Sequence, residues 1–243
     1  HPELVLTGIN IGSYHDRESG RDLGGLVRLL GRIEGLRRLR ISSIEPGDVS
    51  EPLLEAMADT PVVGPHMHIP LQSAAPGVLD AMRRSYTLEQ YLAAIERARR
   101  ILPGLNLTTD AIVGFPAEDE PAFAQTLALC EELAFSKIHV FPYSPRPGTV
   151  AADMEGRPHP DVLRERSARL RGLSDRLGFA HRLARVGSDD VVLVEKRHED
   201  GTLTGFGADY TRVVLPSGAG EPGGMVPVRI AGLAGEHLDG RPR

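Results

Sequence analysis

The chain has 243 residues, of which 41% are hydrophobic and 25% charged, and its formal net charge is −5. This composition supports a packed core and argues against global disorder, and the negative charge argues against general electrostatic attraction to nucleic acid. The longest apolar runs have the length of strands, far short of the roughly 20 residues that span a bilayer. A single cysteine, Cys130, excludes an internal disulfide and any site built from several cysteines of this chain.

Up to about residue 160, short strand patterns alternate with amphipathic helix patterns. The expected strands are Glu3–Leu6, Leu39–Ser42, His66–Ile69, Asn106–Val113 and Lys137–Phe141. Helix starts are marked by Asp22, by Ser50 with Pro52, by the capping box of Thr87 and Gln90, and by Pro121. Five strands separated by helices predict an α/β fold with parallel pairing and right-handed crossovers. Because a complete eight-unit barrel takes about 250 residues, residues 1–160 predict a partial parallel (β/α) barrel.

After this part the sequence changes character twice. Residues 161–186 form one arginine-rich amphipathic segment, which predicts a connector helix. In residues 187–243, short β-branched runs alternate with Gly, Asp and Pro clusters, which predicts a small all-β domain. Since closure protects short strand edges, we expect a closed barrel. Six basic and nine acidic residues give this domain a charge of −3, which weakens the case for RNA binding by charge alone.

Polar or glycine-rich residues follow each of the five expected strands. In parallel α/β sheets the carboxyl ends of the strands meet on one rim and form ligand sites. Glu45 and Asp110 would accept hydrogens from hydroxyl or amine groups, Gln72 would orient a ligand, and Arg84 would hold a carboxylate. Glycines at two strand ends, Gly8 and Gly114, would let the backbone approach that ligand closely. The sequence therefore predicts one pocket for a polar ligand.

Three other side chains have structural roles in this interpretation. We expect His66 and His68 to point to opposite sides of their strand, so that they do not form a metal pair. Cys130 lies on the apolar face of its helix pattern, where we expect a packed thiol.

The strand ends belong to six blocks of sequence that occur together. The blocks are Leu6–Tyr14, Ser42–Pro46, His68–Ser73, Met82–Arg84 before Tyr86-Thr87, Thr109–Pro116 and Phe141–Thr149. In order and spacing they resemble the tRNA methylthiotransferase family of radical S-adenosylmethionine (radical SAM) enzymes. The sequences of residues 42–48 and 139–144 resemble most the branch of the family that acts on N6-threonylcarbamoyladenosine. Residues 187–243 resemble, more loosely, the small RNA-binding TRAM domain of these proteins.

The resemblance implies a radical SAM barrel followed by a TRAM-like domain, in a cytoplasmic enzyme that modifies tRNA next to the anticodon. A [4Fe–4S] cluster and S-adenosylmethionine would supply a radical that removes hydrogen from an adenine C–H bond, and sulfur and a methyl group would be added. The residues implied to bind S-adenosylmethionine are Gly8, Asn10, Ser43, Glu45, Gln72, Arg84, Asp110 and Gly114. Tyr143 and Arg146 are implied to contact the substrate.

The cysteines are the main departure from the family. Its CxxxCxxC motif and N-terminal domain would lie upstream of His1, and one cysteine cannot hold an iron–sulfur cluster. We therefore expect a C-terminal portion of a methylthiotransferase that binds no cluster and is inactive alone. Without the first strand of the barrel, Glu3–Leu6 would have an open edge, through which we expect the chain to self-associate.

Three other functions stay open at this point. The first is a non-catalytic RNA-binding module with the barrel as scaffold. The second is a lyase or aldolase, which would need a Schiff-base lysine or a cluster of His and carboxylate metal ligands at the strand ends. Lys137, the only lysine of the expected barrel, lies instead at the start of a strand. The third is a methylthiotransferase whose substrate is an aspartate of a ribosomal protein.

Overall fold

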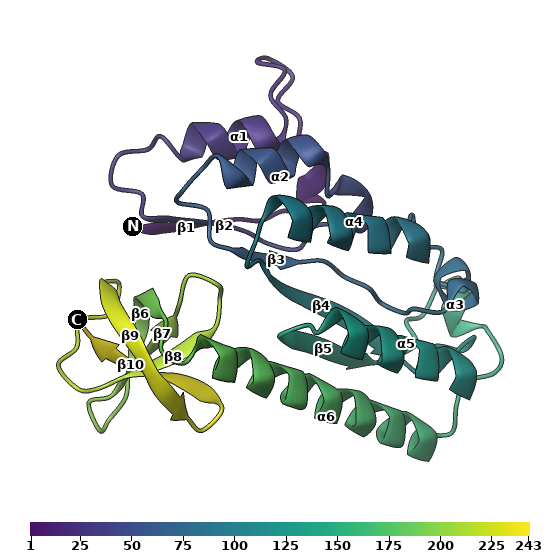
Figure 1. Cartoon of the computed structure of the whole chain (residues 1–243). Coiled ribbons are helices and arrows are strands. Elements are labelled where there is room, and N and C mark those ends of the chain that lie inside the picture. Colours follow the sequence, from purple (N-terminus) through teal and green to yellow (C-terminus); the bar gives the residue numbers. More distant parts are fainter.

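The computed structural model describes residues 1–243 as an α/β body, one long helix and a small β barrel (Figure 1). The strands of the α/β body are β1 (Glu3–Leu6), β2 (Arg38–Ile41), β3 (His66–His68), β4 (Asn106–Val113) and β5 (Lys137–Pro142). Its α-helices are α1 (Leu23–Leu30), α2 (Glu51–Ala58), α3 (Pro76–Ala81), α4 (Leu88–Ile101) and α5 (Glu120–Leu133). Three short 3-10 helices are η1 (Ile11–Ser13), η2 (Pro46–Asp48) and η3 (Val150–Ala152). No helix of the chain combines the length and the apolar character needed to cross a membrane.

The five strands of the body follow one another in chain order. β1 pairs with β2 in parallel, and β3, β4 and β5 form a parallel three-stranded sheet. Between β2 and β3 the pairing is reduced to isolated parallel bridges, Leu39 with Val63 and Ser43 with His68. The body is therefore an open, incomplete (β/α) barrel, and the α/β fold class predicted from the sequence is confirmed.

The helices begin where the sequence indicates. The side chains of Asp22, Ser50 and Asp119 accept hydrogen bonds from backbone N–H groups in the first turns of α1, α2 and α5. Thr87 and Gln90 form the expected capping box at α4. Helix α3 was not predicted, because its six residues are too few to show a period. The helices lie along one side of the strands (Figure 1), and a core cluster of 32 buried residues extends through this layer.

Helix α6 (Pro160–Arg185) runs along β5 and leads to the β barrel (Figure 1). Leu170 and Leu173 of its apolar stripe are buried in the core of the body. The hydroxyl of Ser174 accepts the backbone N–H of Ile138 on β5 at 3.0 Å. The helix is therefore docked on the sheet and does not bridge solvent.

The β barrel consists of five strands. They are β6 (Asp189–Arg197), β7 (Leu203–Phe206), β8 (Arg212–Leu215), β9 (Met225–Ala234) and β10 (His237–Pro242). They close in the order β10-β8-β7-β6-β9 around nine buried aliphatic side chains. The closure agrees with the sequence, but β10 was not predicted, because Gly, Asp and Pro interrupt its β-branched character.

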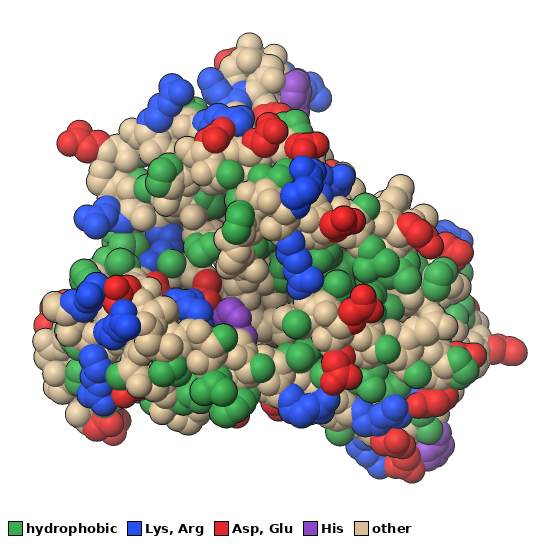
Figure 2. All heavy atoms as spheres, viewed as in Figure 1, with side chains coloured by type: hydrophobic (Ala, Val, Ile, Leu, Met, Phe, Trp, Pro, Cys, Tyr) green, Lys and Arg blue, Asp and Glu red, His purple; other side chains and the backbone are tan.

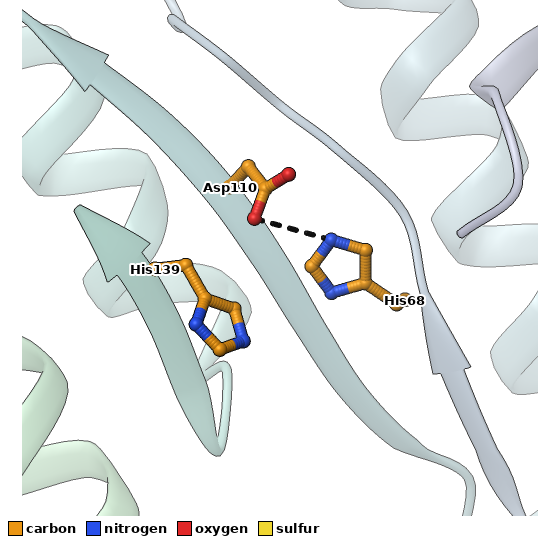
Figure 3. Close-up of side chains that lie close together, drawn as sticks. All are labelled: His68, Asp110 and His139. Carbon is orange, nitrogen blue, oxygen red and sulfur yellow. Dashed lines mark ion pairs between the residues drawn. The ribbon is translucent and has the colours of Figure 1, made fainter. Parts of the chain in front are cut away.

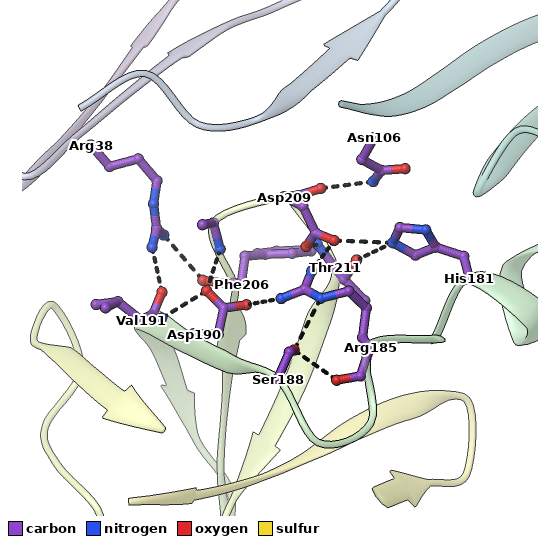
Figure 4. Close-up of polar contacts among 12 residues, drawn as sticks. Arg38, Asn106, His181, Arg185, Ser188, Asp190, Val191, Phe206, Asp209 and Thr211 are labelled. Carbon is purple, nitrogen blue, oxygen red and sulfur yellow. Dashed lines mark hydrogen bonds and ion pairs between the residues drawn. The ribbon is translucent and has the colours of Figure 1, made fainter. Parts of the chain in front are cut away.

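The β barrel is fixed to the amino ends of the body's strands by buried polar contacts (Figure 4). Arg38 on β2 donates to the carbonyls of Val191 and Phe206, and Asn106 on β4 donates to the carbonyl of Asp209 at 2.8 Å. The barrel therefore lies at the end of the body opposite the rim where the sequence predicts the pocket.

The first strand of the body is an open edge, as expected, because β1 pairs only with β2. On β1, Leu4 and Val5 are 37% and 52% exposed.

We expect Val5→Lys to weaken self-association of this chain by about tenfold. Burial of the Val5 side chain between two copies would contribute about 1.5 kcal/mol, and the lysine removes this contribution and places a charge at the edge. Sedimentation velocity over a range of concentrations measures this. The control is Val150→Lys in η3, which is 61% exposed away from the strand edges. A wild-type chain that stays monomeric throughout would contradict the prediction.

Candidate active site

A cleft of about 570 Å³ opens at the carboxyl ends of β4 and β5. Its lining residues are Gln72, Arg84, Asp110, Ile112, Phe141, Pro142, Tyr143, Ser144, Arg146, Thr149 and Ala151. Five residues predicted from the sequence, on four separate segments, thus come together here: Gln72, Arg84, Asp110, Tyr143 and Arg146. The volume is in the range of small-molecule and cofactor sites, about 300–1,000 Å³, and the mixture of apolar, amide and charged groups is typical of them.

Gln72 enters the cleft with an unusual backbone. Its φ of 63° lies in the left-handed region, which is uncommon for residues other than glycine. Two hydrogen bonds hold it there, from its N–H to the carbonyl of Asp110 at 2.8 Å and from the N–H of Ile112 to its own carbonyl at 2.9 Å. Such conformations persist where the surroundings fix them, and they concentrate at functional sites. The residue is buried at 8% exposure, although its side chain is among those that line the cleft.

Arg84 brings an unbalanced positive charge to the cleft. It is half-buried, and its Nε is buried with no hydrogen-bond partner. No carboxylate of the chain lies within ion-pair distance of this guanidinium, whereas most buried polar groups of proteins are satisfied. A ligand carboxylate or phosphate is the natural partner, because guanidinium binds these groups with two parallel hydrogen bonds.

Asp110 lies at the centre of the sheet beside two histidines (Figure 3). Its Oδ1 is 3.2 Å from Nε2 of His68, and Asp110 is paired in register with His139 on β5. Burial, followed by the charge of His68, lowers the pKa of His139. Asp110 was predicted from the sequence, whereas His139 was not. The signal was present, because in parallel strands a residue shares its face with its register partner.

The expectation that His66 and His68 point to opposite sides was wrong. Residues two apart on a strand share a face. Accordingly, Nε2 of His66 and Nδ1 of His68 are both 2.9 Å from the hydroxyl of Thr108. His66 is buried beside Tyr210 of the β barrel, with ring centroids 5.1 Å apart, and burial lowers its pKa to about 3. His66 is thus a neutral residue of the domain contact, and His68 faces the site.

The remaining predicted residues are placed as follows. The hydroxyl of Tyr143 donates to the carbonyl of Ala151 at 2.8 Å, which fixes the ring on one wall of the cleft, and Arg146 is exposed at its mouth. Four other predicted residues do not line this cleft: Gly8, Asn10, Ser43 and Glu45. The first three are exposed, and Glu45 is half-buried where η2 begins. Their role in binding stays a prediction.

Gly114 also lies outside the lining of the cleft, and its place has a packing explanation. Its φ is +79°, and a Cβ there would overlap Cδ1 of Leu163 on α6 and lie 3.2 Å from Cγ of Pro158. Its N–H donates to Glu118 Oε1 at 2.9 Å, and Glu118 pairs with the buried Arg166 of α6. The close approach that glycine permits here is therefore that of α6 rather than of a ligand.

We expect Gly114→Ala to destabilise the fold more than Gly104→Ala. Both glycines have positive φ, +79° and +77°, so both alanines carry a left-handed penalty of roughly 1–2 kcal/mol. Only Gly114 has a neighbour that must move, which adds about 1–3 kcal/mol. Urea unfolding measures the difference. Equal destabilisation by the two variants would show that Gly114 is not held by α6, and would restore the expectation that it serves a ligand.

Cys130 does not fit an iron–sulfur cluster. It is fully buried in the core of the body, as predicted, and burial raises the pKa of its thiol to about 12. A cluster ligand must be an accessible thiolate, and several are needed. Any cluster associated with this fold would therefore take its cysteines from outside residues 1–243.

Residues 7–130 match the family model of the Radical SAM superfamily. They make up just over half of the 243 residues and include the strands β2, β3 and β4. The chain therefore belongs to the radical SAM superfamily, whose chemistry depends on S-adenosylmethionine and a [4Fe–4S] cluster.

Curated relatives point to one branch of this superfamily. A tRNA-2-methylthio-N(6)-dimethylallyladenosine synthase of Parafrankia sp. is 41% identical over 97% of this chain. The enzyme of the same name from Clavibacter michiganensis is 42% identical over 97% of the chain. The chain spans about half the length of these relatives, 50% of the first and 47% of the second.

Solved structures support the fold. Coproporphyrinogen III oxidase from Escherichia coli, a radical SAM enzyme, matches 71% of this chain and 40% of its own, with a TM-score of 0.53 and 22% identity. An archaeal Elp3 from Methanocaldococcus infernus matches 71% of this chain and 44% of its own, with a TM-score of 0.50 and 14% identity. At these identities the likeness concerns the fold alone.

Proposed function

We propose that this chain is part of a methylthiotransferase that modifies an adenosine of tRNA next to the anticodon. The observation that carries the proposal is the cleft at the carboxyl ends of β4 and β5, with the unpaired Arg84 in it. The radical SAM match and the names of the relatives support the same class of reaction.

The cleft residues fit S-adenosylmethionine, which offers a carboxylate, an amino group and a flat adenine. Arg84 would bind the carboxylate, Asp110 would accept hydrogens from amino or hydroxyl groups, and Phe141 and Ile112 would supply an apolar wall. If bound, S-adenosylmethionine and a [4Fe–4S] cluster would supply radical chemistry at the adenine C–H bond. The share of this chain is to bind, orient and exclude water.

For the substrate we propose N6-threonylcarbamoyladenosine. Besides Arg84, the cleft contains a second arginine, Arg146, which makes no ion pair in the chain, and Asp110 is the only acidic residue among those lining it. The threonylcarbamoyl group ends in a carboxylate, which would use this second positive charge, whereas a dimethylallyl group has no charge to offer. The sequences of residues 42–48 and 139–144, which resemble the branch acting on N6-threonylcarbamoyladenosine, support the same substrate. The second candidate is N6-dimethylallyladenosine, favoured by the names of the relatives.

We further propose that the β barrel is a TRAM-like domain that contacts tRNA through specific contacts rather than through bulk charge. In Figure 2, Lys and Arg side chains alternate with Asp and Glu over the visible face of the barrel and body, without a continuous basic surface. A second hollow, of about 680 Å³, lies on the barrel and has side chains of both charges, including Lys196, Arg197, Glu199 and Asp200. The mixture limits non-specific attraction to a polyanion.

The test is mass spectrometry of tRNA nucleosides from cells whose gene for this protein is deleted. We expect the 2-methylthio form of N6-threonylcarbamoyladenosine to disappear and its unmethylthiolated precursor to accumulate. The intact gene should restore it, and a gene carrying Arg84→Met should not. Loss of the dimethylallyl nucleoside instead would select the second candidate substrate. Unchanged tRNA together with an unmodified ribosomal-protein aspartate would refute tRNA as the substrate.

A further inference from the structure

The side chains of His68, Asp110 and His139 converge on the inner face of the sheet (Figure 3). They come from three adjacent parallel strands, β3, β4 and β5, and each offers one ligand atom within 4.8 Å of the other two. Asp110 Oδ1 and His68 Nε2 are already 3.2 Å apart. Tetrahedral coordination with bonds of about 2.0–2.1 Å places neighbouring ligand atoms about 3.3 Å apart. Two of the three donors are thus at the spacing that a bound metal ion needs.

The third donor, His139, lies close to the other two and has no other partner. His139 is exposed, and its ring makes no hydrogen bond within the chain. Its centroid lies 5.6 Å from that of His68, edge to face. Because Asp110 and His139 are register partners on adjacent strands, the imidazole lies beside the carboxylate, and its ligand atom is within 4.8 Å of the other two.

An outer contact orients the inner histidine. Nδ1 of His68 is 2.9 Å from the hydroxyl of Thr108, so that Nε2 is the nitrogen directed at Asp110. Metal-binding histidines usually have the second ring nitrogen held in this way by an oxygen of the protein. Thr108 is itself buried and in contact with Nε2 of His66, which fixes the hydroxyl.

From this arrangement we propose that His68, Asp110 and His139 bind one divalent transition-metal ion, of the Zn²⁺ or Fe²⁺ kind, beside the cleft, whose lining includes Asp110. Two imidazole nitrogens and one carboxylate oxygen suit these ions, whereas Mg²⁺ and Ca²⁺ require mainly oxygen ligands. Three protein ligands leave a coordination position open toward the cleft, where water or an oxygen atom of a cleft ligand completes the shell. This site is separate from the iron–sulfur chemistry of the superfamily, because it uses no cysteine.

The test is metal binding by the chain itself, prepared without a polyhistidine tag and freed of metal with a chelator. Zn²⁺ is measured by equilibrium dialysis with elemental analysis, and Co²⁺ by its visible ligand-field absorption. We expect one ion per chain. His139→Ala should reduce the affinity by at least about 100-fold. Thr108→Val, which removes the hydroxyl that contacts His68 and His66 but no metal ligand, should reduce it by roughly 10- to 100-fold. A tenfold excess of Mg²⁺ should not displace the ion.

His15→Ala is the matched control, since His15 is exposed and distant from the sheet's inner face, and it should bind as the wild type does. Because His139 is exposed and makes no hydrogen bond, its alanine variant is expected to fold, and circular dichroism checks this. Absence of stoichiometric binding by the wild type, or equal binding by His139→Ala, would overturn the proposal. The measurement tests the metal site separately from the methylthiotransferase proposal, because no substrate or activity enters it. The two proposals share only Asp110, whose second carboxylate oxygen would remain for a ligand's hydrogens when Oδ1 binds the ion.

Discussion

Replacing Asp209 with asparagine should lower the free energy of unfolding by about 3 kcal/mol, as expected when one partner of a buried ion pair is removed. The carboxylate is only 5% exposed and lies between the body, α6 and the β barrel (Figure 4). Oδ2 is 3.0 Å from His181 Nε2 and pairs with Arg185, and Oδ1 accepts the N–H of Thr211 at 3.0 Å. The asparagine variant leaves Arg185 partly buried with one carboxylate, that of Asp190, instead of two.

The same loss should depend on pH. Burial by itself would raise the pKa of Asp209, but the hydrogen bond with His181 and the charge of Arg185 outweigh it and hold the pKa well below its ordinary value. A carboxylate with a lowered folded-state pKa stabilises the fold above its unfolded pKa of about 3.9, and the contribution is lost as the pH falls below that value. The difference between wild type and Asp209→Asn should therefore be complete near pH 7 and shrink in acid.

Urea unfolding at several pH values measures both effects, and Asp189→Asn is the control. Asp189 belongs to the same barrel but is 47% exposed, and its pairs with Arg229 and Arg243 lie on the surface. Such pairs contribute about 0–1 kcal/mol. If the two variants are equally stable, Asp209 does not join the barrel to the body in the way described here.

In a form of the protein that turns over S-adenosylmethionine, Arg84→Met should raise the KM for S-adenosylmethionine by about 10- to 100-fold. Methionine has an unbranched side chain like the aliphatic stem of arginine, but it lacks the charged guanidinium. A hydrogen bond to a charged group contributes about 1.5–3 kcal/mol, and each 1.4 kcal/mol is a factor of ten. Because no acid of the chain pairs with Arg84, the fold should lose little stability, in contrast to Asp209→Asn.

The control for this prediction is the preceding residue. Arg83 is exposed and does not line the cleft, so Arg83→Met should leave KM unchanged. Initial rates against S-adenosylmethionine concentration and thermal unfolding of both variants separate binding from folding. An Arg84→Met enzyme with normal KM and a lowered melting temperature would make Arg84 a structural residue.

The sequence by itself determined the helix starts and the strand patterns, which depend on interactions between residues close together in the chain. The helix starts at Asp22, Ser50 and Thr87 follow from side-chain capping, which involves residues three positions apart and needs no tertiary partner. The strand patterns of the body and their alternation with helices gave the parallel α/β class by the same kind of short-range rule. Elements without a strong local period, α3 and β10, were missed for that reason.

The composition of the site required the tertiary structure. Polar residues after successive strands indicated a pocket, and Gln72, Arg84 and Asp110 do meet in one. The sequence could not show that Leu163 of α6 fills the space beside Gly114, where a Cβ would lie. The two residues are 49 positions apart, and their contact depends on how the long helix docks.

The roles of His66 and His68 also depended on the tertiary structure. A strand's period of two places His66 and His68 on one face, so the sequence alone already excluded the expected opposite orientation. Their separate roles were not available, because they depend on what covers each end of β3. The β barrel buries His66 at the amino end, whereas Asp110 and His139 of the neighbouring strands surround His68. Sequence determines which face a side chain takes, and only the packing of distant segments on that face decides whether it is sealed or left open to a ligand.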